Sequence, residues 1–578
     1  RVEFGRKSTF SCKEQPRIMT DSKPWLSSYP EGVPAEIDLN EFSSVNDVFD
    51  EAVRNYADRP AFHNMGTTLT YTELDQRVAQ FAAFLECKLG LKKGDRIVLM
   101  MPNCLQYPIA LFGALRAGLV VVNTNPLYTP RELKHQLQDS GAKAVVVLDN
   151  FGATVETVLK ELKVPHIITS GLGDQLSGLK RPIVNFVVKR IKKMVPAYSI
   201  PGAIRFNDAL AAGKAQNCSR PKVEHGDTAF LQYTGGTTGV AKGAVLTHRN
   251  MIANMQQASA WVGRNVEMGK EIIITALPLY HIFALTANSL VFMKFGGLNW
   301  MITNPRDMPG FIKELKKSNF TAITGVNTLF NGLLNTAGFS ELDFSRLHIS
   351  LGGGMAVQRA VAERWKKTTG CTLVEAYGLT ETSPAAVINP VTLAEYNGAI
   401  GLPIPSTDAR IIDEEGNEVP TGNPGELCIK GPQVMKEYWQ RPEETAKVLS
   451  ADGWLRTGDI ARMDEAGYFY IVDRKKDMIL VSGFNVYPNE IEGVMVAMPG
   501  ILEAAAIGVP DEHSGEAVKL FVVRKDPSIT EAQVKEYAHG SLTGYKRPRH
   551  VEFVTELPKT NVGKILHREL RERELAKQ

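Results

Sequence analysis

A loop rich in glycine and threonine is the segment whose residue types point most directly to chemistry. Residues 233–243 read YTGGTTGVAKG, so four glycines and three threonines accompany a single lysine, Lys242. Glycines let the backbone approach a ligand closely, while N–H groups, hydroxyls and the ammonium can contact phosphate oxygens. Lys242 is followed by Gly243 rather than by Ser or Thr, so the loop is not a Walker A motif. The pattern predicts a phosphate loop of another kind, and the alternative is a plain surface loop.

Two further groups of residues follow short apolar segments. Three glycines at 352–354 come after the expected strand 348–351, and residues 375–381 read EAYGLTE. In an open α/β sheet, nucleotides bind in the crevice outside the carboxyl ends of the strands. The glycines therefore predict a platform for a purine base or, alternatively, a tight strand-to-helix turn. Glu381 is a candidate Mg²⁺ ligand, because hard cations beside phosphates prefer carboxylate oxygens, or else a solvated glutamate at a helix start.

These loops need a layered body to hold them. From about residue 40 to 402, helices alternate with short apolar strands such as 96–101 and 142–148, which is the pattern of a sheet covered on both faces. Ser44 and Asp47 have the spacing of a capping box at the start of the first helix. The large body of the chain is therefore expected to be α/β.

The character of the sequence changes twice after this region. Residues 403–472 combine short strands with Gly, Pro and Asp turns, which predicts a β-rich subdomain. The charged run 473–477 then precedes a compact α+β unit of about 100 residues, an ordinary domain size. We therefore expect a large N-terminal body over 19–475 and a small C-terminal domain over 476–578. Residues 1–18 begin without Met, are interpreted as a non-native or mis-started leader, and are expected to be disordered.

Size, charge and cysteine content narrow the classes of function. A chain of 578 residues exceeds what one core supports, which predicts several domains. The 66 Lys and Arg nearly balance 63 Asp and Glu, and the net charge of +3 argues against a large nucleic-acid-binding face. The six cysteines form no CxxC pair, which argues against a zinc site or a disulfide framework and favours the cytoplasm. No stretch of the sequence has the length and apolarity of a membrane-spanning helix.

One segment favours contact with a membrane surface. Residues 182–196, PIVNFVVKRIKKMVP, combine apolar positions with four basic residues. An amphipathic basic helix of this kind can lie on an anionic leaflet, and the alternative is a packed surface helix with a solvated basic face. Peripheral association with the cytoplasmic face of the membrane is therefore one expectation.

Taken together, the motifs resemble a known family. YTGGTTGVAKG, YGLTE, TGD and the C-terminal Gly563–Lys564 pair look like core motifs of the adenylate-forming superfamily, in that family's order. Residues 452–460 and 471–479 are similar to the fatty acyl-CoA synthetase signature. The chain from about 25 to 575 resembles the bacterial enzymes that ligate long-chain fatty acids to coenzyme A.

The resemblance implies an enzyme that uses ATP, Mg²⁺ and coenzyme A. In the family, a carboxylate attacks the α-phosphate of ATP to give acyl-AMP and pyrophosphate, and the CoA thiol then attacks the acyl carbon and releases AMP. Because two anions must be brought together, cations and positioned donors should dominate catalysis. The alternatives are a ligase for medium-chain or aryl acids, acyl transfer to a carrier-protein thiol, or a non-catalytic protein that binds acyl groups or nucleotides.

The resemblance assigns the nucleotide and metal roles by position. The residues expected at the pyrophosphate end are Thr234, Gly235, Gly236, Thr237, Thr238, Gly239 and Lys242. Those expected around adenine are Gly353, Gly354, Tyr377 and Gly378. Thr380 would contact the α-phosphate, and Glu381 with Thr234 would hold Mg²⁺. Asp459 would accept hydrogen bonds from the ribose hydroxyls, with Arg474 beside it.

The resemblance places the moving parts near the C-terminus. Lys564 is similar to the lysine that bridges the carboxylate and the α-phosphate, where a dehydrated ammonium stabilises the developing charge. Lys476 falls at the hinge, about which the small domain would rotate and bring the loop of Gly483 to the pantetheine tunnel. His281 matches a residue against the path of the substrate carboxylate, in a binding or gating role. From residue type alone, Lys564 and His281 would be interpreted as a solvated lysine and a core histidine.

The acyl site carries the least specific signal. The apolar residues after His281, among them Ile282 and Phe283, resemble those of any buried helix. Some long-chain members carry a gating tryptophan shortly after this histidine, whereas Ala284 and Leu285 stand here. The expected partners are the substrates fatty acid, ATP and CoA, with no nucleic acid. A homodimer is a further expectation.

Overall fold

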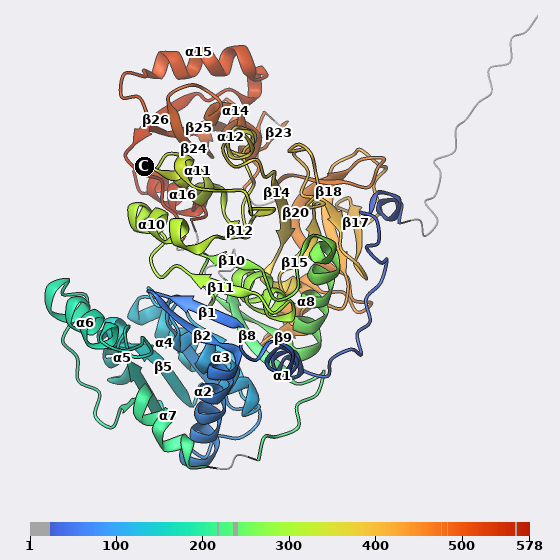
Figure 1. Cartoon of the computed structure of the whole chain (residues 1–578). Helices are drawn as coiled ribbons and strands as arrows, with labels where there is room; N and C mark the ends of the chain where they lie inside the picture. Colours follow the sequence, from blue (N-terminus) through green and yellow to red (C-terminus); the bar gives the residue numbers. More distant parts are fainter. Residues whose placement is uncertain are drawn as a thin grey trace, which may run out of the picture.

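The computed structural model describes residues 23–577, except 217–218, 235–240, 475–476, 483, 512 and 561–562. Within this part of the chain, four sheets and their helices form a large body and a smaller C-terminal part, which lies at the top of Figure 1. The predicted leader 1–18, the glycines and threonines 235–239, Lys476 and Gly483 lie outside the described residues.

The first large sheet is mainly parallel. Its strand order is β19-β9-β8-β4-β3-β5-β6-β7, and only the β8–β9 and β9–β19 pairs are antiparallel. In chain order its strands are β3 Arg96–Met100, β4 Val120–Asn123, β5 Ala144–Leu148, β6 His166–Ser170, β7 Ile204–Arg205, β8 Thr228–Thr234, β9 Lys242–Thr247 and β19 Glu437–Tyr438. Strands β4 and β5 are buried at every residue, as continuous apolar strands of a sheet covered on both faces must be.

The second large sheet has the order β16-β15-β14-β13-β12-β10-β11-β1-β2. Its strands are β1 Pro60–Asn64, β2 Thr67–Thr70, β10 Ile272–Thr275, β11 Leu298–Met301, β12 Ala322–Gly325, β13 Ile349–Gly353, β14 Leu373–Gly378, β15 Ala385–Ile388 and β16 Leu402–Pro403. Strands β12, β13 and β14 pair in parallel, so their carboxyl ends meet at one edge. The glycines at 352–354 and the YGLTE motif are thereby brought side by side.

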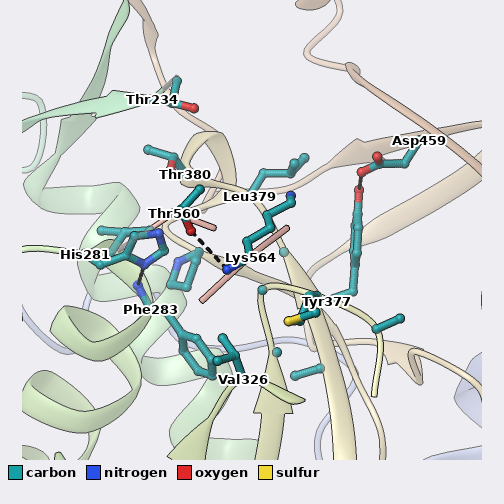
Figure 2. Close-up of a pocket in the computed structure, with 18 of the residues that line it drawn as sticks. Thr234, His281, Phe283, Val326, Tyr377, Leu379, Thr380, Asp459, Thr560 and Lys564 are labelled. Carbon is teal, nitrogen blue, oxygen red and sulfur yellow. Dashed lines mark hydrogen bonds between the residues drawn. The ribbon is translucent and has the colours of Figure 1, made fainter. Parts of the chain in front are cut away.

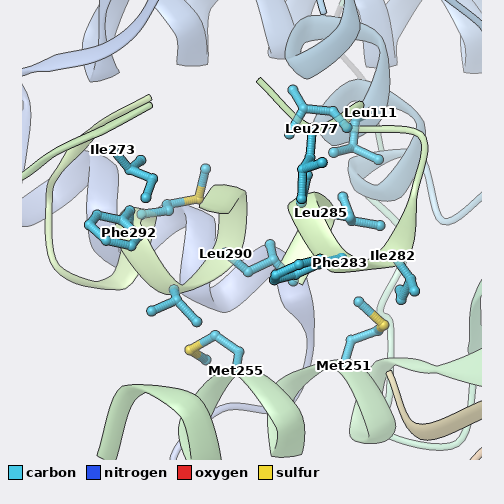
Figure 3. Packing of buried hydrophobic residues seen from close by; sticks show 14 of the residues in the cluster. Leu111, Met251, Met255, Ile273, Leu277, Ile282, Phe283, Leu285, Leu290 and Phe292 are labelled. Carbon is cyan, nitrogen blue, oxygen red and sulfur yellow. The ribbon is translucent and has the colours of Figure 1, made fainter. Parts of the chain in front are cut away.

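Helices cover these sheets. In the large body they are α1 Val45–Tyr56, α2 Tyr71–Ala83, α3 Gln106–Arg116, α4 Pro130–Ser140, α5 Gly152–Leu159, α6 Lys180–Phe186, α7 Phe206–Lys214, α8 His248–Val262, η6 Ala284–Leu290, α9 Val291–Lys294, α10 Met308–Ser318, α11 Asn327–Leu334, α12 Arg359–Thr369 and α13 Pro442–Val448. The capping box at Ser44 and Asp47 is confirmed. Met251 and Met255 of α8 point toward Phe283 and Leu290, so α8 and η6 share one apolar interface (Figure 3).

The rest of the chain forms two smaller sheets. An antiparallel sheet contains β17 Asp408–Ile412, β18 Gly425–Lys430, β20 Leu455–Met463 and β21 Phe469–Arg474. The C-terminal sheet contains β22 Ile479–Val481, β23 Phe484–Val486, β24 Ile501–Asp511, β25 Gly515–Arg524 and β26 His550–Val554, with helices α14 Pro488–Val496, α15 Glu531–Ser541 and α16 His567–Leu575. This part has its own two apolar clusters. The predicted combination of an α/β body, a β-rich sheet and a small α+β part is confirmed.

Candidate active site

One large cavity collects most of the residues that the sequence singles out. It measures about 2590 Å³, more than the roughly 300–1,000 Å³ of ordinary ligand pockets, so it has room for more than one reactant. The predicted site residues in its lining are Thr234, Lys242, His281, Gly353, Gly354, Tyr377, Gly378, Thr380, Glu381, Asp459 and Lys564. Arg474 lies on β21, where its backbone stands opposite that of Asp459 on β20.

A tyrosine and an aspartate define the polar side of the cavity. Tyr377 is the penultimate residue of β14 and donates its hydroxyl hydrogen to Asp459 Oδ2 at 2.6 Å (Figure 2). Gly378 follows, and a Cβ there would lie 1.9 Å from the carbonyl oxygen of Pro384. No side chain fits in that space, so this glycine is needed to let the chain turn into the rest of the YGLTE motif. The motif thus combines one residue required for packing with others that face the cavity.

The carboxylate of Glu381 and the ammonium of Lys242 are linked through one tyrosine. Tyr438 lies on β19, which pairs with β9, and it donates a hydrogen bond to Glu381 Oε1 at 2.6 Å. The Lys242 ammonium lies 5.1 Å from the centre of the Tyr438 ring and forms an ion pair with Glu444 of α13. Lys447 also contacts Glu444, at 2.5 Å, and the two ammonium groups lower the pKa of Glu444 to about 2. This carboxylate is therefore charged at any ordinary pH.

The donors near Glu381 suit a magnesium ion. Glu381 supplies a carboxylate held in place by Tyr438, and the hydroxyl-bearing residues Thr234 and Thr380 line the same space. Proteins usually hold Mg²⁺ through one or two carboxylates together with substrate phosphates and water. The donor set therefore fits an ion that is shared with the phosphates of a nucleotide.

Lys564 reaches the cavity from the C-terminal part, opposite His281 (Figure 2). The backbone N–H of Lys564 donates to Thr560 Oγ1 at 3.1 Å, and Thr328 of α11 donates to the neighbouring Gly563 carbonyl at 3.4 Å. His281 Nδ1 accepts from the backbone N–H of Phe283 at 3.3 Å, so its ring proton resides on Nε2. Burial and then the charge of Lys564 lower the pKa of His281 to about 4. A neutral imidazole and an ammonium therefore face the same space.

A buried carboxyl group also lines the cavity. Burial raises the pKa of Glu375, in β14, to about 8, so this carboxyl is largely protonated at neutral pH. The hydroxyl of Tyr396 lies 3.1 Å from Glu375 Oε2 and donates its hydrogen to the Val357 carbonyl at 2.6 Å. A protonated Glu375 can therefore donate to the tyrosine oxygen.

Sequence reasoning missed both Glu375 and Tyr438. Glu375 did leave a signal, because an ionisable residue inside an otherwise apolar strand implies a special environment. Tyr438 left none, since its contact depends on the pairing of β19 with β9, about 190 residues apart in the sequence.

A second arm of the cavity is mostly apolar. Its lining residues on α8 are four positions apart and therefore share one face of the helix: Asn254, Ala258 and Val262. The same spacing recurs from the residue before η6, through η6 and into α9: Phe283, Ala287 and Val291. Because α8 packs against η6 and α9, the two rows border one slot. The row on α8 extends it over about 12 Å, at about 1.5 Å of rise per residue.

Comparisons with known proteins agree with this geometry. The AMP-binding enzyme family model matches residues 49–439, and the model of the AMP-binding enzyme C-terminal domain matches residues 490–564. The long-chain-fatty-acid–CoA ligase of Escherichia coli O6:H1 is 60% identical over 550 residues, which are 95% of this chain and 98% of that protein.

Two solved structures share the fold. Anthranilate CoA ligase AuaEII in complex with anthranoyl-AMP aligns with a TM-score of 0.83 at 24% identity, over 94% of this chain and 100% of that one. ATP-bound MatB from Rhodopseudomonas palustris aligns with a TM-score of 0.75 at 30% identity, over 92% and 99% of the two chains. With both family models matched and a 60% identical relative over nearly its whole length, the chain belongs to the AMP-binding enzyme family.

Proposed function

We propose that this chain is a long-chain-fatty-acid–CoA ligase, which makes acyl-AMP and pyrophosphate from a fatty acid and ATP and then forms the CoA thioester with release of AMP. The observation that carries this proposal is the junction, within one cavity, of a polar end and an apolar slot. The Escherichia coli relative bears the same name. ATP, Mg²⁺ and CoA are the cofactors and co-substrates of this family of ligases.

In the first half-reaction, a carboxylate oxygen attacks the α-phosphorus and the bond to the pyrophosphate oxygen breaks. Lys564 is proposed to lie between these two anions, where its charge offsets their repulsion and the charge that develops on the phosphoryl oxygens. His281 is neutral and can donate from Nε2 to the carboxylate without removing a proton. It therefore orients the nucleophile rather than acting as a base.

The remaining polar residues are proposed to position the nucleotide. Lys242, with the loop that precedes it, holds the pyrophosphate end, and Thr380 contacts the α-phosphate. Asp459, held by Tyr377, accepts from the ribose hydroxyls. When Mg²⁺ is bound by Glu381 and Thr234, it supplies further positive charge to the phosphates.

For the second half-reaction we propose a rotation of the C-terminal domain, residues 476–578, about the region of Lys476. Lys564 lines the cavity, whereas the described residues that flank Gly483, Ser482 and Phe484, do not. The Phe484 ring instead stacks on Tyr545, with ring centres 4.7 Å apart. In this arrangement Lys564 faces the cavity and the residues beside Gly483 do not. A rotation of the domain between the half-reactions would bring the loop of Gly483 to the reactants and move Lys564 away.

Product analysis tests the proposed reaction. The enzyme is incubated with ATP, Mg²⁺, CoA and a series of acids from hexanoate to stearate, with benzoate as an aryl acid. We expect AMP, pyrophosphate and a thioester, with the highest kcat/KM on long chains. Release of ADP would contradict adenylation. A preference for hexanoate or benzoate would contradict only the long-chain assignment.

Two further properties are proposed, namely peripheral contact with the cytoplasmic face of the inner membrane and a homodimer. No helix among the described residues is long and apolar enough to cross a membrane. A fatty acid is itself apolar, which favours an enzyme that works at a lipid surface. Light scattering after gel filtration tests the dimer, and the mass of a single chain at all concentrations would contradict it.

A further inference from the structure

The segment from Leu179 to Met194 exposes large apolar side chains. It consists mainly of α6 and a π-helical turn, η4 Val187–Ile191, at the outer edge of the molecule (Figure 1). The exposed fractions are 78% for Leu179, 56% for Ile183, 59% for Phe186, 62% for Ile191 and 56% for Met194. These are five of the ten exposed large hydrophobic residues in the described part of the chain. Half of them thus lie within 16 consecutive positions.

The π-helical turn keeps these side chains on one face. Leu179, Ile183 and Phe186 follow at intervals of four and three, which share a face in an α-helix. Ile191 comes five residues after Phe186 and would leave that face in an unbroken α-helix. The i→i+5 bond from Lys192 N–H to the Val187 carbonyl, at 2.7 Å, inserts one extra residue into the turn. The apolar stripe therefore continues through Ile191.

The opposite face of the helix is fixed to the protein by polar contacts. Asn185 Oδ1 accepts from the backbone N–H of Gly173 at 2.8 Å, and Asn185 Nδ2 donates to Asp174 Oδ1 at 2.8 Å. A Cβ at Gly173 would lie 2.9 Å from the Arg181 carbonyl oxygen, so the helix is packed closely on this loop. An ordinary surface helix turns its apolar stripe inward, whereas this one turns it outward.

The polar side chains beside the stripe carry one sign of charge. Residues 179–194 contain six basic and no acidic residues, and all six basic side chains are exposed. Lys180 donates to the Gly66 carbonyl. The other five form no ion pair with any residue that the structure describes: Arg181, Lys189, Arg190, Lys192 and Lys193.

We propose that residues 179–194 bind the surface of an anionic phospholipid bilayer. The stripe would enter the boundary between headgroups and acyl chains, and the lysine and arginine stems would lie along it with their charges at the lipid phosphates. A second copy of the chain that docked through the same segment is disfavoured, because it would place six positive charges opposite six others. A nucleic acid is disfavoured because it would contact the basic residues but leave the apolar stripe in water. The inference rests on the membrane contact proposed above and names the surface that makes it. It does not depend on the ligase reaction, because binding is measured without substrates.

Flotation with lipid vesicles tests whether the basic residues of the segment contribute to membrane binding. The full chain is mixed with vesicles of phosphatidylcholine alone or with added phosphatidylglycerol, at increasing salt. We expect binding only to the anionic vesicles and a loss of binding as salt rises. The double variant Lys189→Gln/Arg190→Gln should partition about 25-fold more weakly, at about fivefold per charge. The control Lys313→Gln/Lys316→Gln on α10 should bind like the parent.

Substitution of two equally exposed methionines tests whether the apolar stripe contributes to membrane binding. Met194 in the segment and Met268 outside it are both 56% exposed. Met194→Ser should weaken vesicle binding, whereas Met268→Ser should not. Equal binding by all variants, or no binding by the parent chain, would overturn the proposal. A concentration-dependent dimer that is lost in Met194→Ser, without vesicle binding, would instead assign the surface to a second copy. Adenylation of octanoate, measured without vesicles, verifies that each variant is folded.

Discussion

Replacing Ala258 with phenylalanine should shorten the fatty acids that the enzyme accepts. Ala258 is the middle residue of the row on α8 that lines the apolar slot, and Val262 lies one turn beyond it. Four residues of helix rise by about 6 Å. With C–C bonds of about 1.5 Å, an extended chain advances about 1.25 Å per methylene. If a long acyl chain fills this slot as proposed, about five of its methylenes would lie beyond Ala258.

The expected size of the effect follows from the burial of these methylenes. Each buried methylene is worth about 0.8 kcal/mol, so excluding five would cost about 4 kcal/mol. At about 1.4 kcal/mol per tenfold, this corresponds to a loss of about a thousandfold in kcat/KM for palmitate. Octanoate is eight carbons shorter than palmitate, more than these five methylenes, so its chain would end before Ala258 and should lose little. Ala258→Leu obstructs less of the slot and should give an intermediate ratio.

The assay is release of AMP with octanoate, decanoate, laurate, myristate and palmitate, each at limiting concentration. The activity of a variant with octanoate shows that it is folded and can still adenylate. The decisive quantity is the ratio of kcat/KM for palmitate to that for octanoate. If Ala258→Phe lowers all five values equally, or leaves the ratio unchanged, then α8 does not border the acyl chain and the assignment of the slot is wrong.

Three other predictions concern the polar side of the cavity. Lys564→Ala should lose acyl-AMP formation by about a thousandfold or more but retain thioester formation from supplied acyl-AMP, and equal loss of both steps would count against domain rotation. Tyr438→Phe removes the hydrogen bond to Glu381 and should raise the Mg²⁺ concentration needed for half-maximal rate several-fold, with little change in the KM for fatty acid; an unaltered Mg²⁺ titration would refute this positioning role. Glu375 has a folded pKa raised to about 8 from an ordinary 4.5, so its contribution to stability is complete below pH 4.5 and is lost as the pH rises toward 8. Glu375→Gln can keep a donor toward Tyr396 and should raise the free energy of unfolding by about 2 to 3 kcal/mol at pH 7 but not at pH 4. Urea denaturation at the two pH values measures this difference. An equal effect at both would contradict the presence of a buried protonated carboxyl group.

Features set by neighbouring residues were predictable from the sequence. The capping box at Ser44 and the alternation of helices with buried strands depend on local spacing, and both were confirmed. The convergence of the YGLTE motif and Asp459 depended on the family resemblance, since these residues are 82 positions apart along the chain.

Contacts that arise only from strand pairing and helix packing were not predictable. The ion pair of Lys242 with Glu444 and the bond of Tyr438 to Glu381 join residues that no periodicity connects. The segment 182–196 shows a similar limit. Its composition predicted an amphipathic basic helix, but only the exposure of its apolar side chains and the contacts of Asn185 in the structure show that the apolar face points outward.

The pairing of Lys242 with Glu444 has a consequence for how the triphosphate is held. Lys242 already has a partner anion, so if it holds the pyrophosphate end of ATP as proposed, ATP must take the place of the Glu444 carboxylate and does not meet an unbalanced cation. Lys447 still contacts that carboxylate, so the displaced group stays within reach. Under the proposed role of Lys242, Glu444 would compete with pyrophosphate for the same cation. It would weaken the binding of the product as well as of ATP, and it would provide an anion to refill the site as pyrophosphate leaves.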